Sequence, residues 1–284
     1  MNNLQNKTVS LCVDNCGVIE LLDKLMDGES KKLNLVVEYN VGQNRCGVES
    51  QDQVLDLVKI INESRHLNFK GIQCYNGSNQ HIKSYEERKL ATQKVVEKTR
   101  SLVDFLEEKG IKVEYVTGGG TGTFEFEMNS GVFTEIQPGS WLFGDADYGS
   151  IMTKNNKPVL EDDSHFYSQS LYILSTVVSK TEGKRVVLDA GLKASTIDSG
   201  NPILKEPQMR VLKYNFGGDE HGILSVNENE KSKDLIDQIN VGDQIQLIPG
   251  HVDPTFNMYD SIIFYNSREN NLVTRVEKIK ARGP

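Results

Sequence analysis

The first 120 residues alternate short apolar runs with segments of helical period, and this alternation restricts the possible fold more than any other feature of the sequence. Each apolar run has strand length and precedes a segment in which apolar residues recur every three or four positions. The predicted strands are 9–13, 33–39, 67–75 and 112–117, and the predicted helices are 18–26, 52–62 and 86–108. Near-continuous apolar strands separated by helices indicate a parallel α/β sheet, either a (β/α)8 barrel or a doubly wound fold.

The helical period almost disappears after about residue 125. A further strand is predicted at 134–143, and 171–178 with 185–188 reads as a hairpin around a Thr-Glu-Gly turn. The remaining predicted strands are 209–216, 222–226, 244–248, 261–265 and 272–279. We therefore predict a parallel α/β domain over residues 1–150 and an antiparallel β domain over residues 151–284.

The number of parallel strands is too small for a closed barrel. A (β/α) barrel needs eight strands, and the first domain supplies about five. An open set of five strands leaves unpaired edges and an uncovered core, which is costly. The first domain is then either an open α/β layer or an incomplete barrel.

Charge and hydropathy exclude several kinds of partner. The net charge of −8 and a pI near 5.3 repel nucleic acid and anionic membranes. No apolar run approaches the roughly 20 residues that span a bilayer. Residues 1–10 are polar and show no secretory signal, so we expect a cytoplasmic protein without nucleic-acid or membrane partners.

All four cysteines, Cys12, Cys16, Cys46 and Cys74, fall in the first quarter of the chain. The spacing of Cys12 and Cys16 would suit a metal pair, but no second pair or nearby histidine completes it. We expect buried, reduced thiols, which agrees with a cytoplasmic compartment.

A glycine-rich segment follows the predicted strand 112–117. Glycines let backbone N–H groups approach a phosphate, and threonine hydroxyls add donors. The segment lacks the lysine of a P-loop, which argues against a nucleoside triphosphate. Its candidate phosphate ligands are Thr117, Gly118, Gly119, Gly120 and Thr121. The alternative is a flexible turn.

Two further candidates follow neighbouring predicted strands. Arg45 lies in a turn between Gly42 and Gly47, where its guanidinium could hold a phenolate or a carboxylate, or could simply be solvated. Tyr75 ends the strand 67–75, and its ring could pack in the core or contact a cofactor.

His251 and Asp253 form the candidate metal site. On an extended backbone, residues two apart face the same side, so an imidazole and a carboxylate could share one cation at roughly 2.0–2.2 Å. Two protein ligands leave the other positions to water or substrate. A surface His-x-Asp without a metal is the alternative.

Two other polar clusters also leave alternatives open. Lys193 could form a salt bridge or contact a substrate. Asp219-Glu220-His221 could form a metal cluster or a hairpin turn.

Together these segments resemble the D-threonine aldolase and D-serine dehydratase family, whose fold is that of alanine racemase: a (β/α)8 barrel followed by a β domain. The resemblance covers residues from about 9 to 260. The matching segments occur in family order and are VGQNRCGV, GIQCYNGS, VTGGGTGT, TEIQPGSWLFGDADY, VVLDAGLKA, DEHG and PGHVDPTFNMYD.

The resemblance implies a cofactor and a metal. Arg45 is expected beside the ring of pyridoxal phosphate, and the loop from Gly118 to Thr121 at its phosphate. Tyr75, Thr117 and Tyr148 are further cofactor-binding candidates. His251 and Asp253 would hold a divalent ion (Zn, Mn or Mg). Asp253 at a position where the dehydratases usually have Cys favours the aldolases.

One family feature does not match. The family's Schiff-base lysine lies in an Arg-Pro-His-x-Lys-like motif on the first barrel strand, upstream of the segments found here. The sequence has no such motif, and Lys193 matches a C-terminal family position. We therefore expect an incomplete barrel whose anchoring amine lies outside this polypeptide.

The resemblance thus implies a lyase of D-β-hydroxy-α-amino acids that catalyses aldol cleavage or dehydration. We expect a homodimer or a complementing N-terminal fragment as partner. The alternatives are a non-catalytic remnant of the same fold that binds a partner, and an independent α/β phosphate-binding enzyme.

Overall fold

The computed structural model describes residues 9–226 and 230–280. The chain divides into two compact units, residues 1–139 and 140–284. The boundary expected near residue 150 therefore lies inside the second unit. In both units the regular elements follow the apolar patterning of the sequence.

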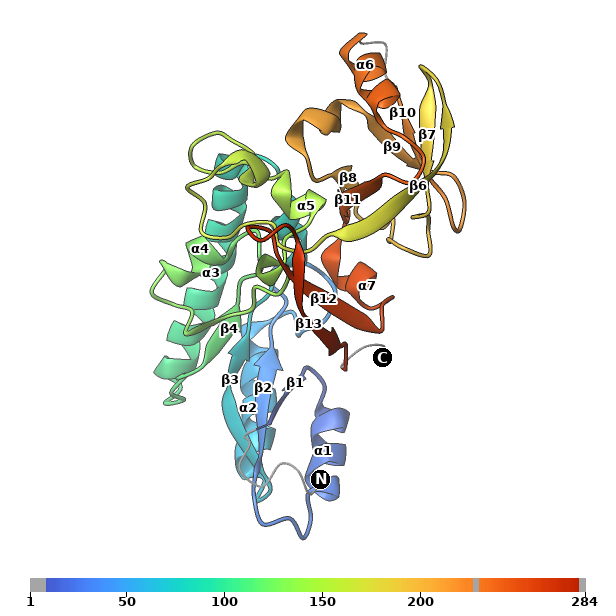
Figure 1. Cartoon of the computed structure of the whole chain (residues 1–284). Helices are drawn as coiled ribbons and strands as arrows, with labels where there is room; N and C mark the ends of the chain where they lie inside the picture. Colours follow the sequence, from blue (N-terminus) through green and yellow to red (C-terminus); the bar gives the residue numbers. More distant parts are fainter. Residues whose placement is uncertain (1–8, 227–229, 281–284) are drawn as a thin grey trace. The chain divides into compact units, whose positions relative to one another are not determined.

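Unit 1 is built on a five-stranded parallel sheet in the order β1-β2-β3-β4-β5 (Figure 1). The strands are β1 Ser10–Val13, β2 Leu33–Glu38, β3 Leu67–Gln73, β4 Val116–Gly118 and β5 Glu135–Ile136. The helices are α1 Cys16–Leu25, α2 Gln51–Glu63, α3 Tyr85–Glu108 and α4 Phe124–Met128, with the 3-10 helix η1 at Gly77–His81. Among the described strands, β1 and β5 each pair on one side only, so this sheet is open.

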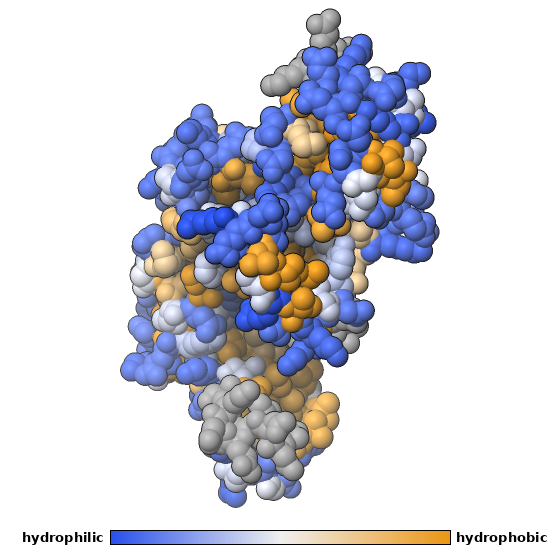
Figure 2. Space-filling model, viewed as in Figure 1, coloured by the Kyte–Doolittle hydropathy of each residue, from blue (hydrophilic) through white to orange (hydrophobic). Residues whose placement is uncertain are grey.

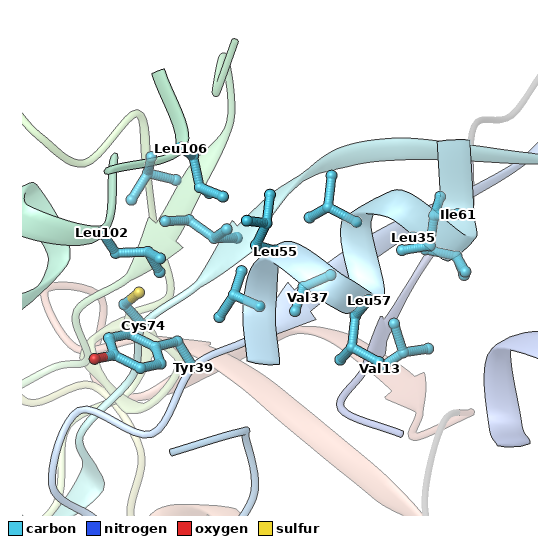
Figure 3. Close-up of a cluster of buried hydrophobic side chains, with 14 of the residues drawn as sticks. Val13, Leu35, Val37, Tyr39, Leu55, Leu57, Ile61, Cys74, Leu102 and Leu106 are labelled. Atoms are coloured by element: carbon cyan, nitrogen blue, oxygen red, sulfur yellow. The ribbon is translucent and has the colours of Figure 1, made fainter. Parts of the chain in front are cut away.

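The core of unit 1 lies between this sheet and its helices (Figure 3). Helix α2 begins with a capping box between Ser50 and Gln53 and buries an apolar stripe at helical spacing. Helix α3 contributes Leu102 and Leu106, both fully buried. Leu90 is one of the apolar residues of this helix, and apolar periodicity places it on the inner side, but it is 58% exposed. The inner side of that turn is formed instead by Arg88 and Thr92.

Two predicted strands of unit 1 are shorter than expected. Only 116–118 of the region after Gly110 pairs as β4, and β5 is limited to 135–136. Pro138 has no N–H for a ladder hydrogen bond, and the 3-10 helix η2 (Ser140–Leu142) follows in unit 2.

Unit 2 contains a six-stranded antiparallel sheet in the order β8-β11-β6-β7-β10-β9. Its strands are β6 Ile173–Thr181, β7 Arg185–Leu188, β8 Ile203–Leu204, β9 Lys213–Phe216, β10 Gly222–Ser225 and β11 Gln244–Ile248. The other elements are α5 Ala146–Gly149, η3 Val159–Glu161, η4 Pro207–Val211, α6 Glu230–Gln238 and α7 Val252–Phe256. The two units confirm the expected fold class, a parallel α/β layer followed by an antiparallel β domain.

A separate hairpin ends the described part of unit 2. It pairs β12 Ser261–Asn266 with β13 Leu272–Lys278. Figure 2 shows apolar side chains gathered on this hairpin. Ile263, Val273 and Val276 are all more than half exposed.

Two elements of unit 2 differ from the prediction. The region 209–216 begins as η4 and becomes a strand only at Lys213. Helix α6 was not predicted, because its sequence is mostly charged and, among its described apolar residues, only Ile236 is fully buried.

All four cysteines are free, as expected, but only Cys74 is buried. Cys12 lies on the edge strand β1, Cys16 opens α1 and Cys46 lies in a loop, so the expected burial is wrong for these three. None of the described helices combines the length and apolar character needed to cross a membrane.

Candidate active site

The glycine-rich loop begins at the carboxyl end of β4 in unit 1, as predicted. Gly119 has a φ of 68°, a left-handed conformation that favours glycine. A side chain at Gly120 would stand 2.6 Å from Gln80 Oε1, so this position also needs glycine. The loop conformation therefore depends on its glycines.

The N–H groups of Gly119 and Gly120 donate to no protein acceptor within the described residues, although both residues are buried. Neighbouring unpaired N–H groups around a left-handed residue form an anion-binding nest, and buried N–H groups are rarely left without an acceptor. The loop can thus hold a phosphate through its backbone.

Two buried side chains form hydrogen bonds with the glycine-rich loop. Gln80 accepts a hydrogen bond from Gly122 N at 3.0 Å and donates to Thr123 Oγ1 at 2.8 Å. Arg88 donates from Nε to Gly122 O at 2.8 Å. Neither Gln80 nor Arg88 was identified from the sequence, because each acts through a contact with a segment far along the chain.

The two candidate threonines lie differently. Thr117 is 2% exposed, donates to Glu135 Oε1 at 2.9 Å and accepts from Gln137 Nε2 at 2.8 Å. Its hydroxyl therefore takes part in a polar network across the strand ends. Thr121 is buried within the glycine-rich loop itself.

Arg45 and Tyr75 lie together in the same unit. The guanidinium of Arg45 is 5.4 Å from the centroid of the Tyr75 ring, a cation–π contact. The Tyr75 hydroxyl is 3.1 Å from the point where a Gly120 side chain would begin. Asn40 fixes the Arg45 turn by accepting from Gly42 N at 3.0 Å and Asn44 N at 3.1 Å. The structure thus brings Arg45, Tyr75 and the glycine-rich loop to one place.

His251 and Asp253 lie in unit 2, where the backbone differs from the prediction. His251 is the N-cap of α7 and Asp253 is in the first turn of that helix, so the extended geometry assumed for this pair is wrong. The two side chains still face each other, with His251 Nε2 3.6 Å from Asp253 Oδ2. Ser140 Oγ donates to Asp253 Oδ2 at 3.1 Å.

Comparison with known proteins identifies the family. Residues 1–147 match the family model "Alanine racemase, N-terminal domain", and residues 170–265 match "Putative serine dehydratase domain". A 3-hydroxy-D-aspartate aldolase of Paracoccus denitrificans (strain Pd 1222) is 37% identical over 97% of this chain and 67% of the relative. A D-threonine aldolase of Arthrobacter sp is 37% identical over 97% of this chain and 68% of the relative.

The chain belongs to the D-threonine aldolase and D-serine dehydratase family. The crystal structure of D-threonine aldolase from Filomicrobium marinum matches with a TM-score of 0.83 at 33% identity, over 95% of this chain and 68% of that one. The expected family membership is therefore confirmed. The chain spans about two thirds of the length of these family members.

Membership of this family implies pyridoxal phosphate. The geometry of unit 1 fits this cofactor, because the loop offers two unpaired N–H groups beside the hydroxyl of Tyr75 and the guanidinium of Arg45. These groups suit a phosphate and an aromatic ring with a phenolic oxygen.

A buried acid lies under the same loop in this family member. Glu127 of α4 is 3% exposed, and its Oε2 is 3.2 Å from the point where a Gly119 side chain would begin. Oε1 accepts from Thr123 Oγ1 at 2.9 Å, whereas Oε2 has no hydrogen-bond partner among the residues that the structure describes. Burial raises the pKa of Glu127 to about 7. The sequence did not identify Glu127 as a candidate, because it lies among other acidic residues with nothing to distinguish it.

Unit 2 surrounds His251 with three carboxylates. Those of Asp253 and Asp198 raise the pKa of His251 to about 9, against the opposing effect of burial. Asp198 Oδ2 contacts His251 Nδ1, on the opposite edge of the ring from Asp253. Asp145 is fully buried and accepts from Val252 N at 2.9 Å, and burial raises the pKa of its carboxyl to about 6.

The distance between His251 and Asp253 suits a shared cation better than a hydrogen bond. At 3.6 Å it exceeds the hydrogen-bond range. Two ligands about 2.0–2.2 Å from one tetrahedral cation lie roughly 3.3–3.6 Å apart. Among the residues that the structure describes, no group of three or more His, Cys, Asp or Glu is arranged to hold a metal, so no third ligand of these types joins this pair.

Tyr148 lies on α5 in unit 2, 7% exposed, in an apolar cluster with Ile151 and Val159, and its contact with the cofactor stays a prediction. Lys193 forms an ion pair with Glu220 at 2.5 Å, which favours its salt-bridge interpretation. The Asp219–His221 segment connects β9 and β10 as the hairpin turn.

Proposed function

We propose that this chain is part of a pyridoxal-phosphate- and divalent-metal-dependent lyase of D-β-hydroxy-α-amino acids. Its relatives at more than 30% identity are aldolases of such compounds. The observation that carries the metal dependence is the 3.6 Å separation of His251 Nε2 and Asp253 Oδ2. Aldol cleavage is favoured over dehydration, because the position two residues after the histidine is Asp253.

Unit 1 binds and orients the cofactor in this proposal. The N–H groups of Gly119 and Gly120 bind the phosphate. The guanidinium of Arg45, held over the ring of Tyr75, would interact with the phenolic oxygen of the cofactor ring. Pyridoxal phosphate, when bound, supplies the electron sink for bond cleavage at the substrate α-carbon.

Unit 2 supplies the metal ligands in this proposal. His251 and Asp253 would hold Zn, Mn or Mg, and the remaining positions of the ion would be available to water or the substrate β-hydroxyl. A divalent ion supplies Lewis acidity that lowers the pKa of such a hydroxyl. Ser140 keeps Asp253 in place through the 3.1 Å hydrogen bond to its Oδ2.

The proposal includes a partner chain or segment and a Schiff-base lysine that this chain does not supply. The edge of β1 is unpaired in the described structure, and Leu11 on it is 40% exposed. A complementing segment carrying the Arg-Pro-His-x-Lys-like motif, or a second copy of the chain, would cover such an edge. The free cysteines support a reducing, cytoplasmic compartment.

Stereoselective cleavage tests this function. Free pyridoxal phosphate with Mn²⁺ does not distinguish enantiomers, because neither is chiral. The full chain is supplied with pyridoxal phosphate, with Mn²⁺ and with methylamine, which replaces the external amine. Glycine release is then measured with D-threonine and with L-threonine as the substrate. We expect faster release from D-threonine, lost in Asp253→Asn. Equal release from the two enantiomers, at the rate without protein, would reject the proposal.

A further inference from the structure

The side of His251 that faces away from Asp253 is occupied by the loop between β7 and β8. Asp198 Oδ2 of this loop contacts His251 Nδ1. Ser199 Oγ donates to Asp198 Oδ2 at 3.3 Å and lies 3.4 Å from the same ring nitrogen. Neither residue belongs to a segment that pointed to the site in the sequence.

We propose that Asp198 is a positioning residue for the metal site, whose carboxylate accepts the Nδ1 proton of His251 and so leaves the Nε2 lone pair directed at Asp253. A neutral imidazole carries its proton on one nitrogen and can bind a cation only through the other. The hydrogen bond at Nδ1 selects the tautomer that binds metal and also fixes the rotation of the ring. This inference rests on the proposed metal site.

The geometry separates this role from that of a third metal ligand. The two nitrogens of an imidazole lie on different edges of the ring. Asp198 is at Nδ1, whereas Asp253 is at Nε2, so one cation between His251 and Asp253 is out of reach of the Asp198 oxygen that contacts Nδ1. The absence of a three-ligand cluster from the described residues agrees with this assignment.

The Asp198 loop is fastened to the segment that carries His251. Thr255 of α7 is 1% exposed, and its Oγ1 accepts from Thr196 N at 3.2 Å. On the other side of His251, Gly250 packs so closely on Gly200 that a side chain there would stand 2.1 Å from Gly200 O. The loop thus contacts the chain both before and after His251. Asp198 is held in register with the ring by backbone packing as well as by its own hydrogen bond.

The variant Asp198→Asn changes the preferred tautomer with little change of shape. The asparagine amide can donate to Nδ1, which places the ring proton on Nε2, where it blocks the cation. Loss of such a supporting hydrogen bond typically lowers metal affinity about 10- to 100-fold. Asp198→Ala removes the hydrogen bond without offering a donor, so we expect a smaller loss.

Mn²⁺ titration of the full chain tests this expectation. We expect Asp198→Asn to weaken Mn²⁺ binding about 10- to 100-fold, Asp198→Ala to weaken it less, and His251→Gln to abolish it. Asp234→Asn, which makes the same change of charge at an exposed residue of α6, should bind like the wild type. Wild-type affinity in both Asp198 variants, together with its loss in His251→Gln, would overturn the inference.

Nitrogen-15 NMR of the histidine rings gives a second readout that needs no metal. Spectra are recorded at about pH 10.5, above the ring pKa of about 9, and His251 is assigned from His251→Gln. We expect the proton on Nδ1 in the wild type and on Nε2 in Asp198→Asn. A wild-type proton on Nε2 overturns the inference. Retention of Mn²⁺ binding by His251→Gln would instead reject the proposed metal site, and the tautomer result would still decide the role of Asp198.

Discussion

Single residues set the electrostatic character of both candidate sites. Glu127 and Asp145 are buried carboxyls whose pKa values are raised by desolvation, one beneath the glycine-rich loop and the other behind the start of α7. Burying an acid in this way costs stability when the acid is ionised. Carboxyls with strongly shifted pKa values occur often at functional sites, which fits the position of Glu127 under an unpaired backbone nest.

Glu127 should make the stability of the chain depend on pH. Its folded pKa of about 7 lies above the ordinary value of 4.5, so the folded state holds more protons between these values. The free energy of unfolding therefore falls by about 3 kcal/mol as pH rises from about 4.5 to about 7, and this group lowers it no further above that pH. In Glu127→Gln this loss should disappear.

Urea unfolding at a series of pH values measures this effect. The unfolding free energy of Glu127→Gln relative to the wild type should rise by about 3 kcal/mol between about pH 4 and pH 8. Glu125→Gln removes the same charge from a partly exposed position of the same helix and should show no comparable trend. A difference between Glu127→Gln and the wild type that is independent of pH would contradict the assignment of a raised pKa.

At the scale of elements, helix α3 shows what a pattern can and cannot predict. Its length and its buried Leu102 and Leu106 follow from helical periodicity. The periodicity did not show that Arg88 and Thr92 occupy the inner side of the first turns while Leu90 faces outward. Arg88 is buried because Gly122 and Ile82 accept its hydrogen bonds, and those partners come from tertiary structure.

Replacing a buried and an exposed leucine of α3 by alanine tests which residues of the helix face the core. Leu102→Ala removes a fully buried side chain and should lower the free energy of unfolding by about 2–5 kcal/mol. Leu90→Ala acts at a position that is 58% exposed and should change it by less than about 0.5 kcal/mol. Equal costs for the two variants, measured by urea unfolding of the full chain, would contradict the described orientation of α3.

The candidate sites were predictable where local sequence determines local geometry. The glycine-rich loop, Arg45 and Tyr75 lie at the ends of strands that the sequence indicates, so their meeting in unit 1 could be expected. The His251–Asp253 pair was found through its spacing, although the backbone there is the start of α7 rather than a strand. Gln80 and Asp198 could not be found in this way, because their partners are far away in sequence.

At the scale of the whole molecule, the proposal assigns the cofactor to one unit of the chain and the metal to the other. Unit 1 has an open parallel sheet with the glycine-rich loop at the end of β4, and unit 2 has an antiparallel sheet with the histidine–carboxylate pair after β11. The family relationship extends over both units. The proposed function depends above all on the binding of pyridoxal phosphate by the loop backbone of unit 1.

Titration of the full chain with pyridoxal phosphate measures this binding. Gly119→Ala places a side chain in a left-handed conformation within the loop, and Gly131→Ala does the same at a φ of 71° outside it, with no atom within 4 Å. We predict one binding site, from which inorganic phosphate displaces pyridoxal phosphate. The affinity for pyridoxal phosphate should be at least about tenfold lower in Gly119→Ala and unchanged in Gly131→Ala. Equal affinity in Gly119→Ala and the wild type, or no binding by the wild type, would contradict the account.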